Sequence, residues 1–418
     1  MSFDIALSGI QAINEALDQT SHNIANAGTY GYKSGRANFS ALVTGSQPQG
    51  TAVGSVSQNI GLSGGVLNTG RALDASINGR GFFVTRTASN EIQYTRVGIF
   101  DTSDNGFLID AAGRRVQGYA VTPPSTVLGA QGDITIPQGQ IPALASTKIS
   151  YVGNMSADWI APAVPFGAVG GGAVTPLAPA DPLSYNMSQS SVVYDTLGTQ
   201  HTLTQYFYAA AAPAPPGQIN VNYVLDGTAI GAPGAADAAL TFSSTGQMTA
   251  PVPPGTVLVT LPALVAATGA TLNPINIDYT GTTFFAGKAT TTNNSWDGYA
   301  SGVFSNVELA KDGSVVAKYS NGKSQTVAMI ALATFPDEGA LTAVNDTSWT
   351  ASIGSGTALT STPGSGMAGT LNTSSLEQSN VDITSELVGL MTSQRNYQAN
   401  SKVIQTESTM LQSLMQAI

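Results

Sequence analysis

Cysteine is absent from this chain of 418 residues, so neither a disulfide framework nor a thiolate metal site can form. Histidine is nearly absent, and a metal site built on histidine would need His22 and His201 to meet across domains. No stretch of the sequence approaches the roughly 18 continuous apolar residues of a transmembrane helix. We therefore expect a soluble chain with no metal site and no membrane insertion.

Charged residues are also scarce, at 10% of the chain against about a quarter in an average domain. The surface must therefore be covered by Ser, Thr, Asn, Gln and Gly, which pack against neighbouring molecules with little charge to desolvate. The net charge of −10 leaves no basic stripe that could neutralise phosphates or anionic lipid headgroups. Nucleic acid and membrane surfaces are thus poor candidates for partners.

The amino terminus, Met1 to Asp4, lacks the positive region and the apolar region of a secretory signal. We expect no cleaved signal peptide. A cytoplasmic protein would fit this composition, and so would a protein exported by a dedicated machine.

Both ends of the sequence have the seven-residue repeat of helices that pack as coiled coils. Residues 1–28 and 376–418 are expected to form the terminal helical domain, with Ser379–Asp382 as the N-terminal cap of the C-terminal helix. A single amphipathic helix packed on its own domain shows a similar stripe, but two at opposite termini favour a coiled-coil domain, in which the termini pair with each other or with neighbouring chains. The C-terminal repeat also includes Ile383 and Ile418. The predicted assembly seam consists of Phe3, Ile10, Leu17, Ile24, Leu390, Tyr397, Ile404 and Leu411.

Between these ends the sequence indicates short strands separated by Gly, Asn-Gly and Asp-Gly turns. Residues 29–70 are rich in Gly and Ser and are expected to form a connector. An inner β-rich domain is expected over 71–146 and 288–375, where Asp312-Gly313 and Asn321-Gly322 bracket the strands of a hairpin. Residues 147–287 are expected to form an inserted outer β-rich domain. The predicted fold class is mixed and mainly β, with nested β-rich domains inserted between terminal helices.

Charge supports the inserted domain, because Lys148 is the only cation between residues 116 and 287. Seven aspartates in the same range bring its net charge to −6. Pro-, Ala- and Gly-rich stretches at 161–182 and 209–217 are expected to be surface loops.

No motif that could carry chemistry is complete. Gly322-Lys323-Ser324 resembles the end of a phosphate-binding loop, but Ala317 stands where that loop needs a glycine. Asp101 to Gly106 resembles the start of a calcium loop, but Ala112 stands where it needs a glutamate. A turn between strands explains each of the two stretches.

A Ser191, Asp195 and His201 triad lacks the strand-turn-helix elbow that would expose a nucleophilic serine. No pair of glutamates lies in a stretch that looks buried, so general acid–base catalysis has no candidates. We expect no catalytic residue, no cofactor and no enzyme activity.

Both termini resemble the signatures of the flagellar axial rod and hook family. The N-terminal resemblance lies in Ser21–Ala27 and Gly31–Lys33, and the C-terminal one in Leu376–Asp382 and Gln394–Lys402. Ala27-Gly28 and Tyr30 to Tyr32 depart from the more usual residues. The residues that carry this family signature are Asn23, Ala25, Asn26, Gly31, Lys33, Ser379, Asn380, Val381, Asp382, Gln394, Arg395 and Tyr397.

Further stretches show whether the chain is more similar to rod proteins or to hook proteins. Leu73–Phe83, with Tyr94–Arg96 and Gly118-Tyr119, is similar to the start of the inner domain in both rods and hooks. Segments that are similar to hook proteins in particular are Asp181–Tyr208, Asp297–Gly302, Tyr319–Gly322 and Ile330–Phe335. The chain is thereby identified as a member of the bacterial flagellar hook proteins, although 161–182 matches nothing in that pattern.

The resemblance implies a structural subunit of a self-assembling helical tube that acts as a universal joint between the basal-body rod and the filament. It implies that the terminal helices line an export channel, the inner domain forms the wall and the inserted domain faces solvent. The implied partners are further copies of the chain, the distal rod protein, the hook cap, the hook–filament junction proteins and the flagellar export apparatus. The implied location is the extracellular flagellum.

Three other functions compete with this interpretation. A distal rod protein would share both terminal signatures but lack the inserted domain. A secreted adhesin or carbohydrate-binding domain would leave the heptad ends unexplained, and an extracellular hydrolase would need an acid–base pair.

Overall fold

The computed structural model describes residues 2–44, 47–122, 127–164, 166, 182–231, 235–252, 255–261 and 269–416. The chain divides into two compact units. The terminal unit contains residues 1–138, 305–318 and 324–418, and the inserted unit contains residues 139–304 and 319–323. As the sequence predicts, the fold is mainly β, and helices from the two ends pack together.

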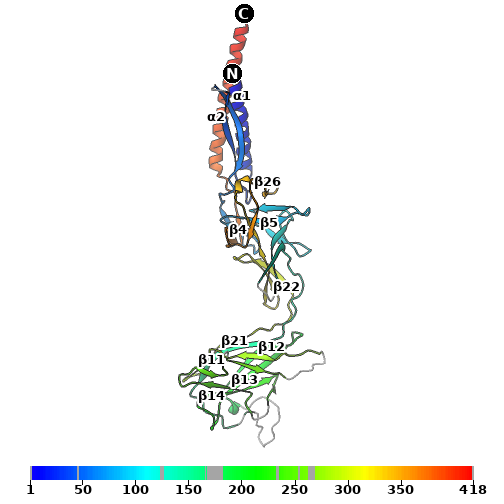
Figure 1. Ribbon diagram of the computed structural model, residues 1–418, viewed down its shortest axis with the longest axis vertical. Coiled ribbons are helices and arrows are strands. Elements are labelled where there is room, and N and C mark those ends of the chain that lie inside the picture. The colour runs from blue at the N-terminus through cyan, green and yellow to red at the C-terminus, as the bar shows by residue number, and fades with distance from the viewer. Residues whose placement is uncertain are drawn as a thin grey trace. The chain divides into compact units, whose positions relative to one another are not determined.

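The two helices of the described residues are α1 (Ser2–Ala25) and α2 (Ile383–Gln416). They lie side by side and antiparallel, with the end of α2 extending beyond the start of α1 (Figure 1). The Asp382 carboxylate caps α2 by accepting hydrogen bonds from the Thr384 amide (3.0 Å) and the Ser385 hydroxyl (2.7 Å). The expected cap in Ser379–Asp382 is therefore confirmed.

Residues 29–70, expected to be a connector, contain a long antiparallel hairpin of β1 (Gly35–Thr44) and β2 (Gln47–Gln58). The hairpin packs on α1, where the Ser8 hydroxyl accepts a hydrogen bond from the Thr51 amide (3.2 Å). The Gly- and Ser-rich composition concealed these strands, because both residues have low strand propensity. Their ladder hydrogen bonds and their contact with α1 compensate for that propensity.

The largest sheet of the terminal unit contains thirteen described strands, in the main order β22-β23-β24-β9-β5-β6-β27-β26. Two smaller pairs, β29 with β4 and β3 with β30, join segments from opposite ends of the chain. The strands are β3 (Val66–Asn68), β4 (Ala75–Asn78), β5 (Phe82–Arg86), β6 (Ile92–Thr95), β7 (Phe100–Thr102), β8 (Leu108–Asp110), β9 (Arg115–Val121), β10 (Leu128–Asp133), β22 (Phe304–Leu309), β23 (Ser314–Tyr319), β24 (Ser324–Ile330), β25 (Leu332–Thr334), β26 (Thr342–Val344), β27 (Ser348–Thr350), β28 (Leu359–Ser361), β29 (Thr370–Thr373) and β30 (Ser375–Glu377).

The core of this sheet is aromatic. Phe82 packs edge to face on Phe335 and Trp349, and Tyr94 packs in the same way on Phe335. The predicted strand between Asp312-Gly313 and Asn321-Gly322 is confirmed as β23, and it forms a hairpin with β24 across the turn at Asn321-Gly322. The expected turn at Asp101–Gly106 joins β7 to β8.

The inserted unit consists of a five-stranded and a six-stranded sheet around one core. The first contains β18 (Thr256–Val259), β19 (Ile275–Asp278), β11 (Lys148–Ser156), β20 (Thr283–Phe285) and β21 (Thr290–Trp296). The second contains β12 (Met187–Tyr194), β13 (Gln200–Ala209), β14 (Gln218–Leu225), β15 (Thr228–Ala229), β16 (Ala238–Phe242) and β17 (Met248–Ala250).

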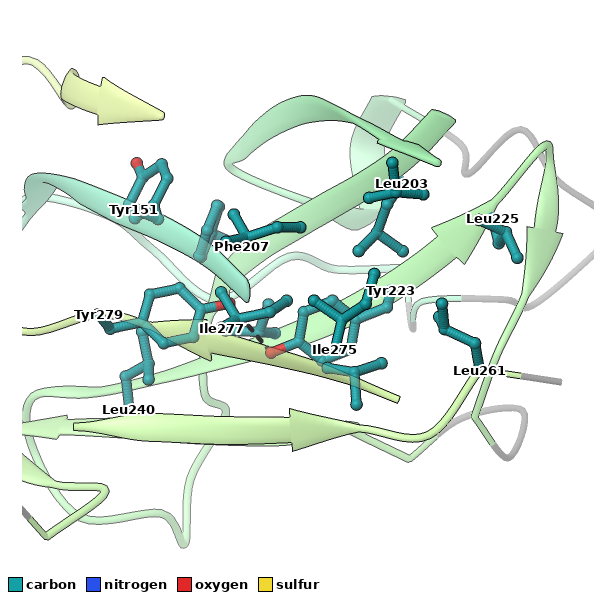
Figure 2. Close-up of a cluster of buried hydrophobic side chains, with 14 of the residues drawn as sticks. Tyr151, Leu203, Phe207, Tyr223, Leu225, Leu240, Leu261, Ile275, Ile277 and Tyr279 are labelled. Carbon is teal, nitrogen blue, oxygen red and sulfur yellow. Dashed lines mark hydrogen bonds between the residues drawn. The ribbon is translucent and has the colours of Figure 1, made fainter. Parts of the chain in front are cut away.

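The core between these sheets is mainly apolar and contains a buried polar chain of Tyr223, Tyr279 and Gln205. Figure 2 shows Tyr223 and Tyr279 with their hydroxyls directed at each other, 3.0 Å apart. The Tyr279 hydroxyl also lies 2.6 Å from Gln205 Oε1. Burial raises the pKa of both tyrosines above their ordinary value.

The inserted unit extends beyond the expected range of 147–287. Residues on both flanks pair with each other, Ile141 with Gly302 and Leu144 with Tyr299, and so join the unit. Such isolated bridges leave no pattern in a sequence. The loop expected at 161–182 lies largely outside the described residues.

Candidate functional site

The exposed apolar surface of the helix pair is the first candidate for a functional surface. None of the predicted seam residues is buried within the chain: Phe3, Tyr397 and Leu411 are 43%, 40% and 58% exposed. Ile10, Leu17, Ile24, Leu390 and Ile404 are half-buried. The described part of α2 buries no residue at all. Packing within one chain therefore leaves much of both apolar stripes uncovered.

Small and polar residues contribute specific contacts between α1 and α2. The buried residues of α1 are Ala6, Ala12 and Asn23. Gly9 lies so close to α2 that a Cβ atom on it would be 2.9 Å from Asn400 Nδ2. Further along the pair, Asn23 Nδ2 donates a hydrogen bond to Glu386 Oε1 (2.8 Å). These contacts join the two helices through the Asn400 and Glu386 side chains of α2.

Asn23, one of the signature residues, joins three segments at the base of the helices. Its Nδ2 donates to the Gly35 carbonyl (2.8 Å), and its Oδ1 accepts from the Gly35 amide (2.8 Å) and the Tyr32 hydroxyl (3.3 Å). With the bond to Glu386, this one side chain connects the end of α1, the start of the hairpin and the first turn of α2.

Lys33, a second signature residue, belongs to a buried ionic group that we call the Glu377 cluster: Lys33, Arg96 and Glu377. Lys33 Nζ lies 2.6 Å from Glu377 Oε1, and Arg96 lies 3.4 Å from Glu377 Oε2. Each of the three is at most 2% exposed. Burial lowers the pKa values of Lys33 and Arg96, although Glu377 opposes the effect on both.

The remaining signature residues divide into two groups. Gly31 donates its amide hydrogen to the Glu377 carbonyl (2.9 Å), and Asn380 accepts from the Ser34 amide (2.7 Å) and donates to the Asn59 and Leu62 carbonyls (2.9 and 3.0 Å). The second group lies on or near the helices without taking part in this network: Ala25, Asp382, Gln394, Arg395 and Tyr397 are exposed, and Asn26, Ser379 and Val381 are half-buried.

Sequence analysis missed the importance of Glu377 and Arg96. Both stand next to apolar residues at the ends of short strands, and a charged residue in such a setting is the one signal that could have found them. Their partners come from distant parts of the chain, which spacing alone does not reveal.

Ser191, Asp195 and His201 are not arranged as a catalytic triad. The Ser191 hydroxyl donates to Asn294 Oδ1 (2.7 Å), whereas His201 pairs with Asp226 (2.6 Å) and lies 3.6 Å from Asp195. Lys323, in the turn between β23 and β24, lies over the Tyr299 ring. Within the described ranges there is no cluster of three or more metal-ligating side chains. No helix in the described part of the chain has the length and apolarity needed to span a membrane.

Comparisons with known proteins cover most of the chain. Residues 76–157 match the flagellar hook protein FlgE/F/G D1 domain, 168–299 match the flagellar basal body protein FlaE D2 domain, and 372–417 match the flagellar basal body rod FlgEFG protein C-terminal family. The flagellar hook protein FlgE of Salmonella typhimurium is 34% identical over 99% of both chains. This chain belongs to the flagellar hook protein family.

Another member, the hook protein FlgE of Escherichia coli, is 33% identical over 99% of both chains. A crystal structure of the hook protein FlgE2 of Helicobacter pylori aligns with a TM-score of 0.47 and 13% identity, covering 68% of this chain and 93% of its own. Membership of the hook family confirms the predicted role as a structural subunit of the bacterial flagellar hook and not an enzyme.

Proposed function

We propose that this hook-family chain polymerises through its terminal helices into a flexible helical tube that joins the basal-body rod to the filament and encloses the export channel. The observation that carries the proposal is the apolar surface that α1 and α2 leave exposed. Soluble monomers rarely expose large contiguous apolar patches, and patches of this kind mark interaction sites.

The last turns of α2 illustrate this surface most clearly. Met410, Leu411, Leu414 and Met415 are 64%, 58%, 59% and 78% exposed. Their spacing places them on one side of the helix. They lie near the C-terminal end of α2, and that end of the helix extends beyond the start of α1 (Figure 1). A second copy of the chain would cover them in the polymer.

The domain roles follow from this assembly. The terminal helices, α1 and α2, would line the channel. The β-rich part of the terminal unit would form the wall, and the inserted unit, residues 139–304 and 319–323, would face solvent. Because that inserted unit carries few charges, its outer contacts can slide among similar packings without large desolvation costs.

Other flagellar components complete the proposal. The partners would be the distal rod protein, the hook cap, the hook–filament junction proteins and the flagellar export apparatus. That apparatus would deliver the chain to the cell exterior without a cleaved signal peptide. The lack of cysteine supports this route, because disulfides would obstruct passage of an unfolded chain through a narrow channel.

A pair of matched substitutions tests assembly through the helices. Leu411→Asp would place an unpaired carboxylate in the buried contact between copies, whereas Gln405→Asp adds the same charge at an exposed polar position of α2. We expect both variants to fold, but only Gln405→Asp to form tubes in sedimentation assays and electron microscopy. Normal tubes from Leu411→Asp would rule out the seam, and a parent chain that stays monomeric under all assembly conditions would rule out self-assembly.

A further inference from the structure

The Glu377 cluster is more than a pair of salt bridges, because five separate segments of the chain converge on it. Besides Glu377, Lys33 Nζ donates to the Leu62 carbonyl (2.8 Å) and Arg96 donates to the Gly79 carbonyl (2.9 Å). Glu377 Oε1 also accepts from the Gly64 amide (3.1 Å). Each charged group therefore binds one segment through a backbone atom while it binds another through its ionic partner.

The charges within the cluster do not balance. Two cations share one carboxylate, and Arg96 Nε lacks a hydrogen-bond partner in the described structure. The nearest second carboxylate, Glu338, acts on Lys33 and Arg96 over a longer range and is itself paired with Arg80 (2.9 Å). Buried ionic groups of this kind add little stability over apolar residues of similar size, because desolvation offsets the attraction.

A stability role therefore does not explain why the chain buries these three residues, but a geometric role does. Ionic pairs with additional hydrogen bonds are satisfied in one arrangement only, whereas an apolar contact tolerates several. The backbone nearby is equally restrictive: Gly64 packs directly against the Gln378 carbonyl, where no Cβ atom fits, and Gly31 has a φ of +68°.

We propose that Lys33, Arg96 and Glu377 are positioning residues, forming an ionic clasp that admits one register between the two ends of the chain and so fixes the direction in which α1 and α2 leave the β-sheet. The location supports this, because α1 ends at Ala25, shortly before Lys33, and α2 starts at Ile383, shortly after Glu377. The proposal rests on assembly through the helices, which is the function proposed above.

Helix length makes that direction consequential. The 34 residues of α2 span about 51 Å, so a tilt of about 10° at its base moves its far end by roughly 9 Å. This displacement equals the usual distance between packed helices, about 8–10 Å. A loosened clasp would therefore displace the seam most strongly at the far end of α2, near Leu411.

The test distinguishes an effect on the direction of the helices from an effect on the stability of the fold. Lys33→Met/Glu377→Gln removes one charge of each sign, keeps the net charge of the cluster and leaves an amide oxygen to accept from Gly64. The matched control, Lys318→Met/Glu308→Gln, makes the same changes in an exposed ion pair of the same 2.6 Å length. Because the chain has no cysteine, spin labels can be attached to cysteines placed at the exposed Asp104 and Gln398, and the distance between labels measured.

Gln398 lies about 23 Å along α2 from its base, so a tilt of about 10° moves it by roughly 4 Å. We expect the clasp variant to keep the denaturant midpoint of the parent, while its label-to-label distances spread by about 4 Å and its tubes are lost. The control should match the parent in all three measurements. Unchanged distances together with normal tubes would overturn the proposal.

If the double variant unfolds, Lys33→Met/Arg96→Met/Glu377→Met shows whether the unpaired Arg96 is the cause. A triple variant that folds with broadened distances supports the clasp, and one that also unfolds overturns it by showing a stability role. Should the parent chain itself form no tubes, the proposed function fails, while the label distances still decide the clasp.

Discussion

Gly9 of α1 faces the side chain of Asn400 of α2: a Cβ atom on Gly9 would lie 2.9 Å from Asn400 Nδ2, so a larger side chain there must displace the end of the Asn400 side chain. A Cβ atom placed on Gly389, in α2, would have no neighbouring atom within 4 Å. The two helical glycines therefore have different physical roles, although both carry the same intrinsic penalty in a helix, about 1 kcal/mol relative to alanine.

This contrast predicts that a leucine substitution destabilises the fold at Gly9 but not at Gly389. Gly9→Leu should lower the free energy of unfolding by about 1–3 kcal/mol, because the leucine side chain must displace Asn400 and the contact between the helices must repack. Gly389→Leu should be neutral or stabilising, since it gains helix propensity without a clash. Denaturant unfolding followed by circular dichroism measures both, and equal effects at the two sites would contradict close packing at Gly9.

A second prediction concerns the hydrogen bonds of Asn23. Asn23→Ala should lower the free energy of unfolding by about 1–3 kcal/mol, because the buried Gly35 amide and carbonyl lose their partner. Amide hydrogen exchange at Gly35 should accelerate in the variant. Asn14→Ala, at an exposed position of the same helix, is the control and should change neither measurement.

The buried tyrosines of the inserted unit predict a loss of stability in alkali. Burial raises the pKa of Tyr279 well above its ordinary value of 10.0, so the folded state holds this proton after the unfolded state has released it. The stabilising contribution is therefore complete below about pH 10 and declines as pH rises above it, by up to about 1.4 kcal/mol per pH unit. Tyr279→Phe should flatten this decline in denaturant titrations between pH 9 and 11, and an unchanged slope would refute the assignment.

Asp133 predicts the opposite dependence in acid. Although burial alone would raise its pKa, hydrogen bonds from Arg86, Gln117 and Arg115 hold the pKa below the ordinary value of 3.8. Its contribution is present above that value and is lost as pH falls through the folded-state pKa. Asp133→Asn should reduce the acid sensitivity of unfolding. Asp104→Asn, in an exposed turn, should leave the acid sensitivity as in the parent.

The sequence by itself determined the features that depend on local periodicity and turn chemistry. The seven-residue repeats predicted both terminal helices, and Asn-Gly and Asp-Gly pairs predicted the turns at residues 312 and 321, because these signals lie within a few neighbouring residues. The signature segments likewise indicated the hook family directly from their residues.

Tertiary structure alone decided which side chains meet. Gly9 and Asn23 of α1 contact Asn400 and Glu386 of α2, and neither residue belongs to the apolar repeat that the sequence shows. The hairpin over 35–58 is stabilised by its ladder and by α1, not by strand propensity. The Glu377 cluster joins residues 33, 96 and 377, and nothing in a linear sequence records which distant charges fold against one another.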